Sequence, residues 1–236
     1  MTVIGVLFVL AYVSSYRVRD KLWVMYYDLR YNTKLVESEK EIDKVLARFE
    51  SFPYSQLPKD YKEATLSHQK PYAGMLRTAR YYKVPYKDVY TKIVGEHRIK
   101  DLMPKDAFYK DHVFGGEDII WLIDPRVLKK LLMLEKLLIK EGYDPSHIKV
   151  VNGYRHPAYN KKVGGASQSR HIVGEAIDMS IGDVDGNGRI EKADKKVVLD
   201  LLDQKVIRSF GGIGLYPKSQ SVHMDVRGYR ARWDSY

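Results

Sequence analysis

Two histidines and an aspartate in the C-terminal third of the chain, His171, Asp178 and His223, are side chains that could hold a metal ion. His171 and Asp178 are seven residues apart, and on one regular strand this odd spacing would put them on opposite faces, more than ~20 Å from each other. They can reach one ion only if the chain turns between them, and Gly174 lies midway and permits such a bend. His223 lies in the β-like segment 221–226 and comes from a different element.

Two imidazoles and one carboxylate around an open fourth position are typical of a catalytic zinc site. The open position holds water, and the metal lowers the pKa of that water to about 7, so hydroxide becomes available at neutral pH. The chain contains no cysteine, which excludes disulfide scaffolds, thiolate catalysis and thiolate zinc sites. Any metal must therefore be held by His, Asp or Glu. The alternative is a metal-free pair of strands.

The stretch from Ser169 to Asp178 matches every fixed position of the pattern S-x-H-x-x-G-x-A-x-D. This motif marks the zinc peptidases grouped with lysostaphin, the D-alanyl-D-alanine metallopeptidases and the hedgehog signalling domain. The later block Gly-Gly-Ile-Gly-x-Tyr-Pro, followed by Val-His-x-Asp and by Arg232-Trp233, resembles the murein endopeptidase branch of the D-Ala-D-Ala group. The resemblance covers roughly residues 110 to 236 and uses many fixed positions, which makes a chance match improbable.

The resemblance implies roles for particular residues. The zinc ligands of such families are His, Asp and His, which correspond here to His171, Asp178 and His223. Arg155, just after a predicted strand, corresponds to a residue that polarises the substrate carbonyl, and a fixed cation near a developing oxyanion suits the transition state. Ser169 could hydrogen-bond a ligand or the substrate, or be a turn residue.

The chain lacks an acidic residue where relatives often carry the general base. They often carry an acid two or three residues before the last histidine, where this chain has Ser221 and Gln220. Asp225 follows His223 by two residues, so on a strand it shares the same face. Asp225 could be the base or could orient His223, and both interpretations stay open. The missing acid keeps open a third possibility, a binding module that has lost catalysis.

A second metal site is predicted at residues 183–194, which resemble an EF-hand or dockerin-like calcium loop. Gly188 stands where such loops turn sharply, and Ile190 is the apolar residue that follows. Hard oxygen ligands at this spacing suit calcium rather than zinc. The alternative is a polar loop without an ion. The predicted calcium ligands are Asp183, Asp185, Asn187, the carbonyl of Arg189, and Asp194.

The elements that must position these residues can be predicted from periodicity. Residues 125–140 form an amphipathic helix with Asp124 as N-cap and Gly142 after its end. Residues 147–152 are rich in β-branched side chains and predict a strand, and a second helix is expected over 195–207. We expect an α+β fold, a small antiparallel sheet that carries the zinc site and is flanked by helices, with a helical N-terminal extension.

The domain organisation follows from these patterns. Residues 1–16 contain an apolar run too short for a membrane span, which suggests a signal or membrane anchor. Residues 17–110 form an extension of unknown role, and residues 111–236 form the zinc peptidase domain with its calcium loop. The net charge of +10 favours an anionic partner such as the cell wall. No block of lysine and arginine indicates a nucleic-acid partner.

The sequence therefore predicts an enzyme that needs zinc and calcium and hydrolyses peptide bonds of peptidoglycan, as a D,D-endopeptidase or D,D-carboxypeptidase in cell-wall remodelling. Its place would be periplasmic or extracytoplasmic, with membrane anchoring through the N-terminus. One alternative is a phage-type endolysin that cuts the bond between L-Ala and D-Glu. The other is a zinc- and calcium-binding module without catalysis.

Overall fold

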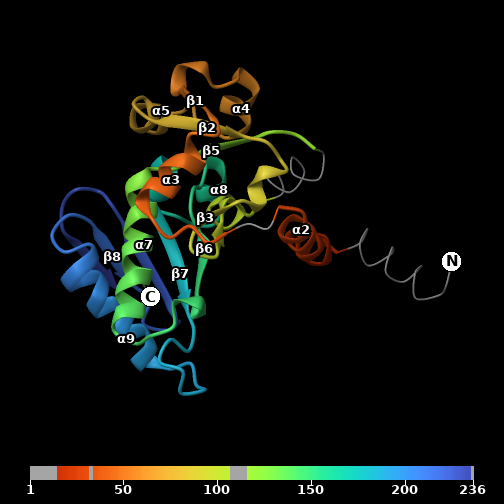
Figure 1. Ribbon diagram of the computed structural model, residues 1–236. Helices are drawn as coiled ribbons and strands as arrows, with labels where there is room; N and C mark the ends of the chain where they lie inside the picture. The colour runs from red at the N-terminus through yellow and green to blue at the C-terminus, as the bar shows by residue number, and fades with distance from the viewer. Residues whose placement is uncertain (1–14, 32–33, 107–115, 235–236) are drawn as a thin grey trace.

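The computed structural model describes residues 15–31, 34–106 and 116–234 (Figure 1). Most of the predicted signal or anchor, residues 1–14, lies outside these ranges. Within them, no helix is both long enough and apolar enough to cross a bilayer.

The chain forms an α+β fold, as the sequence predicts. Before residue 107 the elements are α2 (Tyr16–Tyr31), α3 (Glu39–Leu46), β1 (Glu50–Pro53), α4 (Lys59–Ala64), α5 (Tyr72–Leu76), β2 (Arg80–Val84), β3 (Lys92–Val94), β4 (His97–Arg98) and η3 (Ile99–Leu102). After residue 115 they are β5 (Ile119–Leu122), α7 (Pro125–Lys140), β6 (Ile148–Asn152), α8 (Pro157–Lys162), η5 (Arg170–Val173), β7 (Ala176–Ile181), α9 (Lys192–Leu201), β8 (Gly212–Leu215), β9 (Ser221–Asp225) and β10 (Ala231–Asp234).

A five-stranded sheet in the order β10-β8-β9-β7-β6 carries the C-terminal part of the fold. Its strands pair antiparallel except β10 with β8, which run parallel. Side chains alternate between the two faces. Ile177, Met179 and Met224 point to one face, where they are fully buried, while Asp178 and His223 point to the other. α7 and α9 lie over the apolar face (Figure 1).

α7 begins and ends where the sequence predicts. The Asp124 carboxylate accepts a hydrogen bond from the backbone N–H of Arg126, and Pro125 occupies the first turn, where a missing N–H costs nothing. Gly142 follows the helix with a φ of +86°, a conformation that favours glycine. The predicted apolar face is buried, at residues Val127, Leu128, Leu131, Leu132, Leu134 and Leu138.

The part of the chain before residue 107 contains the expected helices but also strands. β2 pairs antiparallel with β1 on one side and with β5 on the other, so a strand from the predicted extension and one from the predicted peptidase domain share a sheet. Side chains from both segments, such as Tyr81 and Trp121, belong to one buried cluster. Residues 80–98 supply the strands of this part: β2 pairs with β5, which lies far away in the sequence, and β3 pairs with β4 across a turn.

The substitution Leu131→Ala tests the packing of α7. Leu131 is fully buried, and removing a buried leucine side chain leaves a cavity that costs about 2–5 kcal/mol of unfolding free energy. Ile139→Ala is the matched control, since Ile139 lies on the same helix and is 62% exposed, and it should change stability by no more than about 0.5 kcal/mol. Urea denaturation measures both. Equal losses in the two variants would mean that α7 does not bury its Leu131 face.

Candidate metal centre

Three ligand atoms converge on one point beside the polar face of the five-stranded sheet. His171 Nε2 lies 3.2 Å from Asp178 Oδ1 and 3.2 Å from His223 Nδ1, and His223 Nδ1 lies 2.9 Å from Asp178 Oδ1. All three residues are buried, with exposed fractions of 2%, 7% and 5% for His171, Asp178 and His223. The structure therefore brings together the three residues that the motif predicts as zinc ligands.

The turn between His171 and Asp178 forms as the sequence predicts. His171 lies in the short helix η5, where the Ser169 hydroxyl accepts a hydrogen bond from the His171 backbone N–H. Gly174 ends η5 with a φ of +70°. A β-carbon there would lie 2.6 Å from the Leu122 carbonyl oxygen, so the position needs glycine for its conformation and for space. Ser169 thus acts here as a cap of the turn.

The register of β7 with β9 places the other two residues. Asp178 stands directly opposite His223 in the antiparallel pair, and directly opposite residues share a face. Because η5 precedes β7 and folds back over it, His171 approaches the same point from outside the sheet. Three segments of backbone therefore supply one ligand atom each.

The hydrogen bonds of the imidazoles fix which ring nitrogen faces the centre. His171 Nδ1 lies 2.7 Å from the Gly153 carbonyl oxygen, which can only accept, so Nδ1 carries the proton and Nε2 presents its lone pair. His223 Nε2 lies 3.1 Å from Asp225 Oδ2, so its proton is on Nε2 and Nδ1 presents the lone pair. Both rings are thus held in the tautomer that a metal ligand requires.

Asp225 lies behind His223, on the far side of the ring from the centre. It is fully buried. Its carboxylate accepts hydrogen bonds from the Gly212 backbone N–H at 2.9 Å and from Arg227 Nε at 2.8 Å. A β-carbon on Gly212 would lie 2.3 Å from this carboxylate, so glycine makes the room for it. Two roles were predicted for Asp225, general base and orientation of His223, and this geometry matches the second.

Arg155 lies next to Asp178. Its Nη2 donates to Asp178 Oδ2, the carboxylate oxygen that does not face the histidines. The backbone N–H of Arg155 also donates to the His171 carbonyl at 3.1 Å. The guanidinium therefore compensates the charge of Asp178 and leaves Oδ1 for the centre.

The pKa shifts follow from burial and from the contacts among these groups. Burial acts to lower the pKa of His223, but its hydrogen bonds to Asp178 and Asp225 outweigh burial and raise it. Burial lowers the pKa of His171 and outweighs the charge and hydrogen bond of Asp178, which act to raise it. Burial acts to raise the pKa of Asp178, but the charges and hydrogen bonds of His171 and His223 outweigh it and hold that pKa far below its usual range. For Asp225, burial is likewise outweighed by hydrogen bonds from His223 and Arg227, and its pKa is also low. Both carboxylates are ionised at neutral pH.

Comparison with protein families identifies the chain. Residues 94–233 match the family model described as peptidoglycan L,D-endopeptidase MepK. The chain belongs to this family. It is therefore a member of the zinc D-Ala-D-Ala peptidase group and a metallopeptidase that acts on peptidoglycan, as the sequence predicts. A search of curated proteins and a search of solved structures each returned no match.

Because peptidoglycan lies outside the cytoplasm, membership in this family implies an extracytoplasmic enzyme. The family is zinc-dependent, and the donor set fits that metal. Tetrahedral zinc holds N and O ligands at about 2.0–2.1 Å, which separates them from each other by roughly 3.3–3.4 Å. The separations of 2.9, 3.2 and 3.2 Å are close to this value. Three protein ligands leave one position open, as in catalytic zinc sites.

Several residues of the centre were not predicted. Trp233 packs against the His223 ring with centroids 5.0 Å apart, and Arg227 lies over the same indole. Gly214 stands opposite His223, and a β-carbon there would lie 2.7 Å from the indole. The sequence signal was the pair Gly212 and Gly214 together with the later Arg-x-Arg-Trp. Two glycines on one face of a strand leave room for a large side chain, here an indole, to lie across that face.

The predicted calcium loop forms a compact turn. Asp183, Asp185 and Asp194 each offer one oxygen within 4.8 Å of the others. Gly188 has a φ of +83°, and Asp183 Oδ2 accepts from its backbone N–H at 2.8 Å. Asp194, however, accepts from the backbone N–H groups of Val184 and Glu191, and it caps α9. Asn187 and Arg189 lie in the same loop, and the family does not imply calcium. The calcium site stays a prediction.

The substitution Asp225→Asn distinguishes the two roles of Asp225. If Asp225 orients His223, the variant should bind zinc about 10- to 100-fold more weakly, because residues behind the ligands tune metal affinity by that much. Competition with a chromophoric chelator measures the affinity. Asp200→Asn is the matched control, since Asp200 pairs with Lys196 at the surface. Normal zinc affinity with lost hydrolysis would instead make Asp225 the general base.

Proposed function

We propose that this chain hydrolyses a peptide bond of peptidoglycan at a zinc ion held by His171, Asp178 and His223. The observation that carries the proposal is the convergence of three buried ligand atoms, each within 3.2 Å of the other two. In the absence of an ion, these three atoms can be paired only if a histidine takes up a further proton. The pKa of His223 is raised accordingly, because its hydrogen bonds to Asp178 and Asp225 outweigh its burial. A cation at this point would take the place of that proton.

In this proposal the remaining polar residues hold the ligands in place. Asp225 keeps the proton of His223 on Nε2, and Arg155 holds Oδ2 of Asp178 so that Oδ1 stays free. The Gly153 carbonyl does the same for His171. Bound zinc would supply a Lewis acid and an activated water at the open position. The chain's membership in an enzyme family argues against the binding-module alternative.

The bond that is cut is the finer question. The family description names an L,D-endopeptidase, and on this ground we propose the L,D cross-link between two peptide stems as the first substrate. The D,D cross-link, which the sequence analysis favoured, is the second. A D,D-carboxypeptidase and a phage-type cut between L-Ala and D-Glu are further alternatives. Each gives a different product, so a digest can separate them.

The test is a digestion of purified cross-linked muropeptides by the zinc-loaded protein, followed by mass spectrometry. We expect dimers joined through an L,D bond to be converted to monomers and dimers joined through a D,D bond to remain. His171→Ala should abolish the conversion, since it removes one of the three proposed zinc ligands. His68→Ala is the matched control, because His68 is an exposed histidine. Conversion of D,D dimers alone would restore the D,D prediction.

Absence of all products from a protein that holds stoichiometric zinc would overturn the peptidase proposal. Loss of a terminal residue, without separation of dimers, would identify a carboxypeptidase. Release of stem peptides that lack L-Ala, with L-Ala left on the sugar, would identify the phage-type cut.

We propose calcium binding at residues 183–194 separately, on the approach of Asp183, Asp185 and Asp194. Calcium at 100 times its dissociation constant should stabilise the fold by about 2.7 kcal/mol, which raises the melting temperature by roughly 5–10 °C. Magnesium is the control ion, and Asp183→Asn with Asp185→Asn is the control protein. A melting temperature that calcium leaves unchanged would show a polar loop without an ion.

A further inference from the structure

The proposed function leaves one group unassigned, the donor that stabilises negative charge on the carbonyl oxygen of the cut bond. Arg155 was predicted for this role, and its role stays a prediction. Its Nη2 donates to Asp178, while its Nε has no hydrogen-bond partner in the described part of the chain. Resting on the proposed function, we propose that Tyr216 donates a hydrogen bond from its phenol to this oxygen. Lys195 acts as a positioning residue that holds Tyr216 there.

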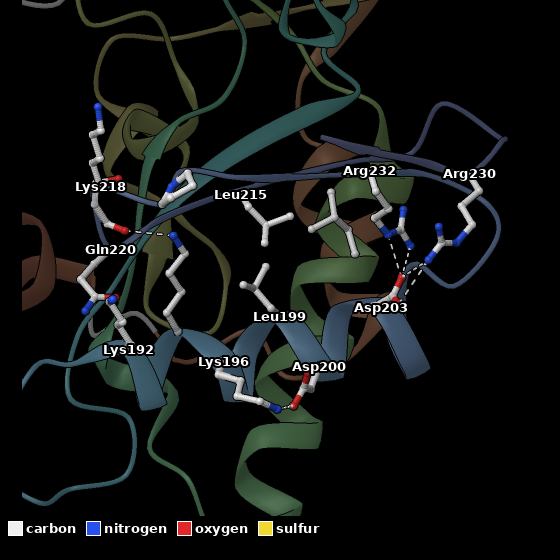
Figure 2. Close-up of a pocket in the computed structure, with 14 residues that line it drawn as sticks. Lys192, Lys196, Leu199, Asp200, Asp203, Leu215, Lys218, Gln220, Arg230 and Arg232 are labelled. Carbon is white, nitrogen blue, oxygen red and sulfur yellow. Dashed lines mark hydrogen bonds and ion pairs between the residues drawn. The ribbon is translucent and has the colours of Figure 1, made fainter. Parts of the chain in front are cut away.

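The alternation of β8 directs Tyr216 to the metal side of the sheet. Gly214 stands opposite His223, and Leu215 stands opposite Val222 on the other face. Figure 2 shows Leu215 pointing toward Leu199 of α9, on the helix side. Tyr216 is the first residue after β8, and continuing the alternation of the strand by one residue directs it to the face that carries His223. It is the first residue after the two glycines of β8 whose side chain extends over that face.

The environment of the Tyr216 phenol agrees with this placement. The side chain is half-buried. Burial raises the pKa of Tyr216, and the negative charge of Asp178 raises it further while Arg155 acts in the opposite direction. These interactions require the phenol to lie within electrostatic range of the centre. The hydroxyl stays protonated at neutral pH, so it can donate, and within the described residues it has no hydrogen-bond partner.

Lys195 ties down the backbone of Tyr216. The lysine is buried, with an exposed fraction of 8%, and Nζ donates to the Tyr216 carbonyl at 2.8 Å and to the Ser219 carbonyl at 2.9 Å. The Ser219 N–H also donates to the Tyr216 carbonyl at 3.0 Å, which closes a turn over 216–219. A buried ammonium that bonds two carbonyls of one turn fixes the conformation of that turn.

A hollow separates part of this turn from α9. A hollow of about 770 Å³ lies between the turn and α9, and Lys218, Gln220 and Lys192 border it at one end (Figure 2). The two hydrogen bonds from Lys195 cross from the helix to the turn beside this hollow. We therefore expect that loss of Lys195 lets the turn, and Tyr216 with it, move away from the metal face.

The role of the phenol predicts the size of its effect. A donor aimed at a developing oxyanion strengthens its hydrogen bond in the transition state, and removing one such donor lowers kcat by about 10²–10³-fold. The substrate carbonyl carries little charge before the reaction, so KM should change much less.

The experiment compares Tyr216→Phe, Lys195→Met, Lys195→Arg and the double variant Y216F/K195M, all zinc-loaded, on the muropeptide dimer that the wild type cuts. We expect Tyr216→Phe to lose about 10²–10³-fold in kcat with unchanged zinc affinity. Lys195→Met should lose ~10- to 100-fold through misplacement, and Lys195→Arg should recover part of it. The double variant should lose no more than Tyr216→Phe alone, because Lys195 acts through Tyr216. Lys196→Met, at a neighbouring surface lysine that pairs with Asp200, is the matched control.

The outcomes separate this inference from the proposed function. A wild type that cuts the dimer, with His171→Ala inactive and Tyr216→Phe fully active, would overturn the role of Tyr216 and leave the peptidase intact. Fully additive losses in the double variant would overturn the role of Lys195. Melting temperatures check folding, and if Lys195→Met fails to fold, the comparison rests on Lys195→Arg and Tyr216→Phe. A wild type without activity would contradict the proposed function itself.

Discussion

The antiparallel pairing of β7 with β9 is the constraint on which the metal centre depends. It sets Asp178 opposite His223, and because side chains alternate along a strand, a slip of one residue would turn one of them to the other face. The opposite face prevents that slip. Ile177, Met179 and Met224 are fully buried there against the helices, so a change of register would put apolar side chains at the centre and charged ones in the core. The same hydrophobic core that stabilises the fold thus fixes the ligand geometry.

A second layer of polar contacts makes the burial of these charges tolerable. A buried carboxylate or imidazole without a partner costs several kcal/mol. Each ligand here has a separate supporting group: the Gly153 carbonyl for His171, Arg155 for Asp178, and Asp225 for His223. Arg227 in turn balances the charge of Asp225. The supporting groups also fix the ring tautomers. The hydrogen bonds that pair the buried polar atoms are therefore the same ones that orient the ligands.

Local patterns and the motif predicted a large part of the site. The position of α7 follows from its cap, its apolar period and the glycine after it, and the bend between His171 and Asp178 follows from Gly174. The direction of Asp225 could not be predicted. Its position on a strand gives the face it shares with His223, but the ring nitrogen it contacts depends on Gly212 and Arg227, which come from elsewhere in the chain.

The strands before residue 107 escaped prediction for a related reason. β2 reads Arg-Tyr-Tyr-Lys-Val, and its alternation is weak because two tyrosines stand together. Its partner β5 begins at residue 119. Pairing between strands so far apart in the sequence cannot be predicted from the residues of either segment alone. Likewise, the parallel pairing of β10 with β8 that carries Trp233 onto His223 depends on tertiary contacts and not on local preference.

These long-range contacts also connect the segment before residue 107 to the metal centre. The loop 153–156 supplies the Gly153 carbonyl and Arg155, and it packs directly against that segment. A β-carbon on Gly153 would lie 2.3 Å from the Leu102 carbonyl oxygen, whose hydrogen bond from the Tyr154 N–H is 2.8 Å long. Asp106 lies 2.7 Å from His156 Nε2. The family match begins at residue 94 and so includes these contacts. The groups that orient His171 and Asp178 are therefore held from outside the zinc-binding strands, and the unit that forms the site begins well before the motif.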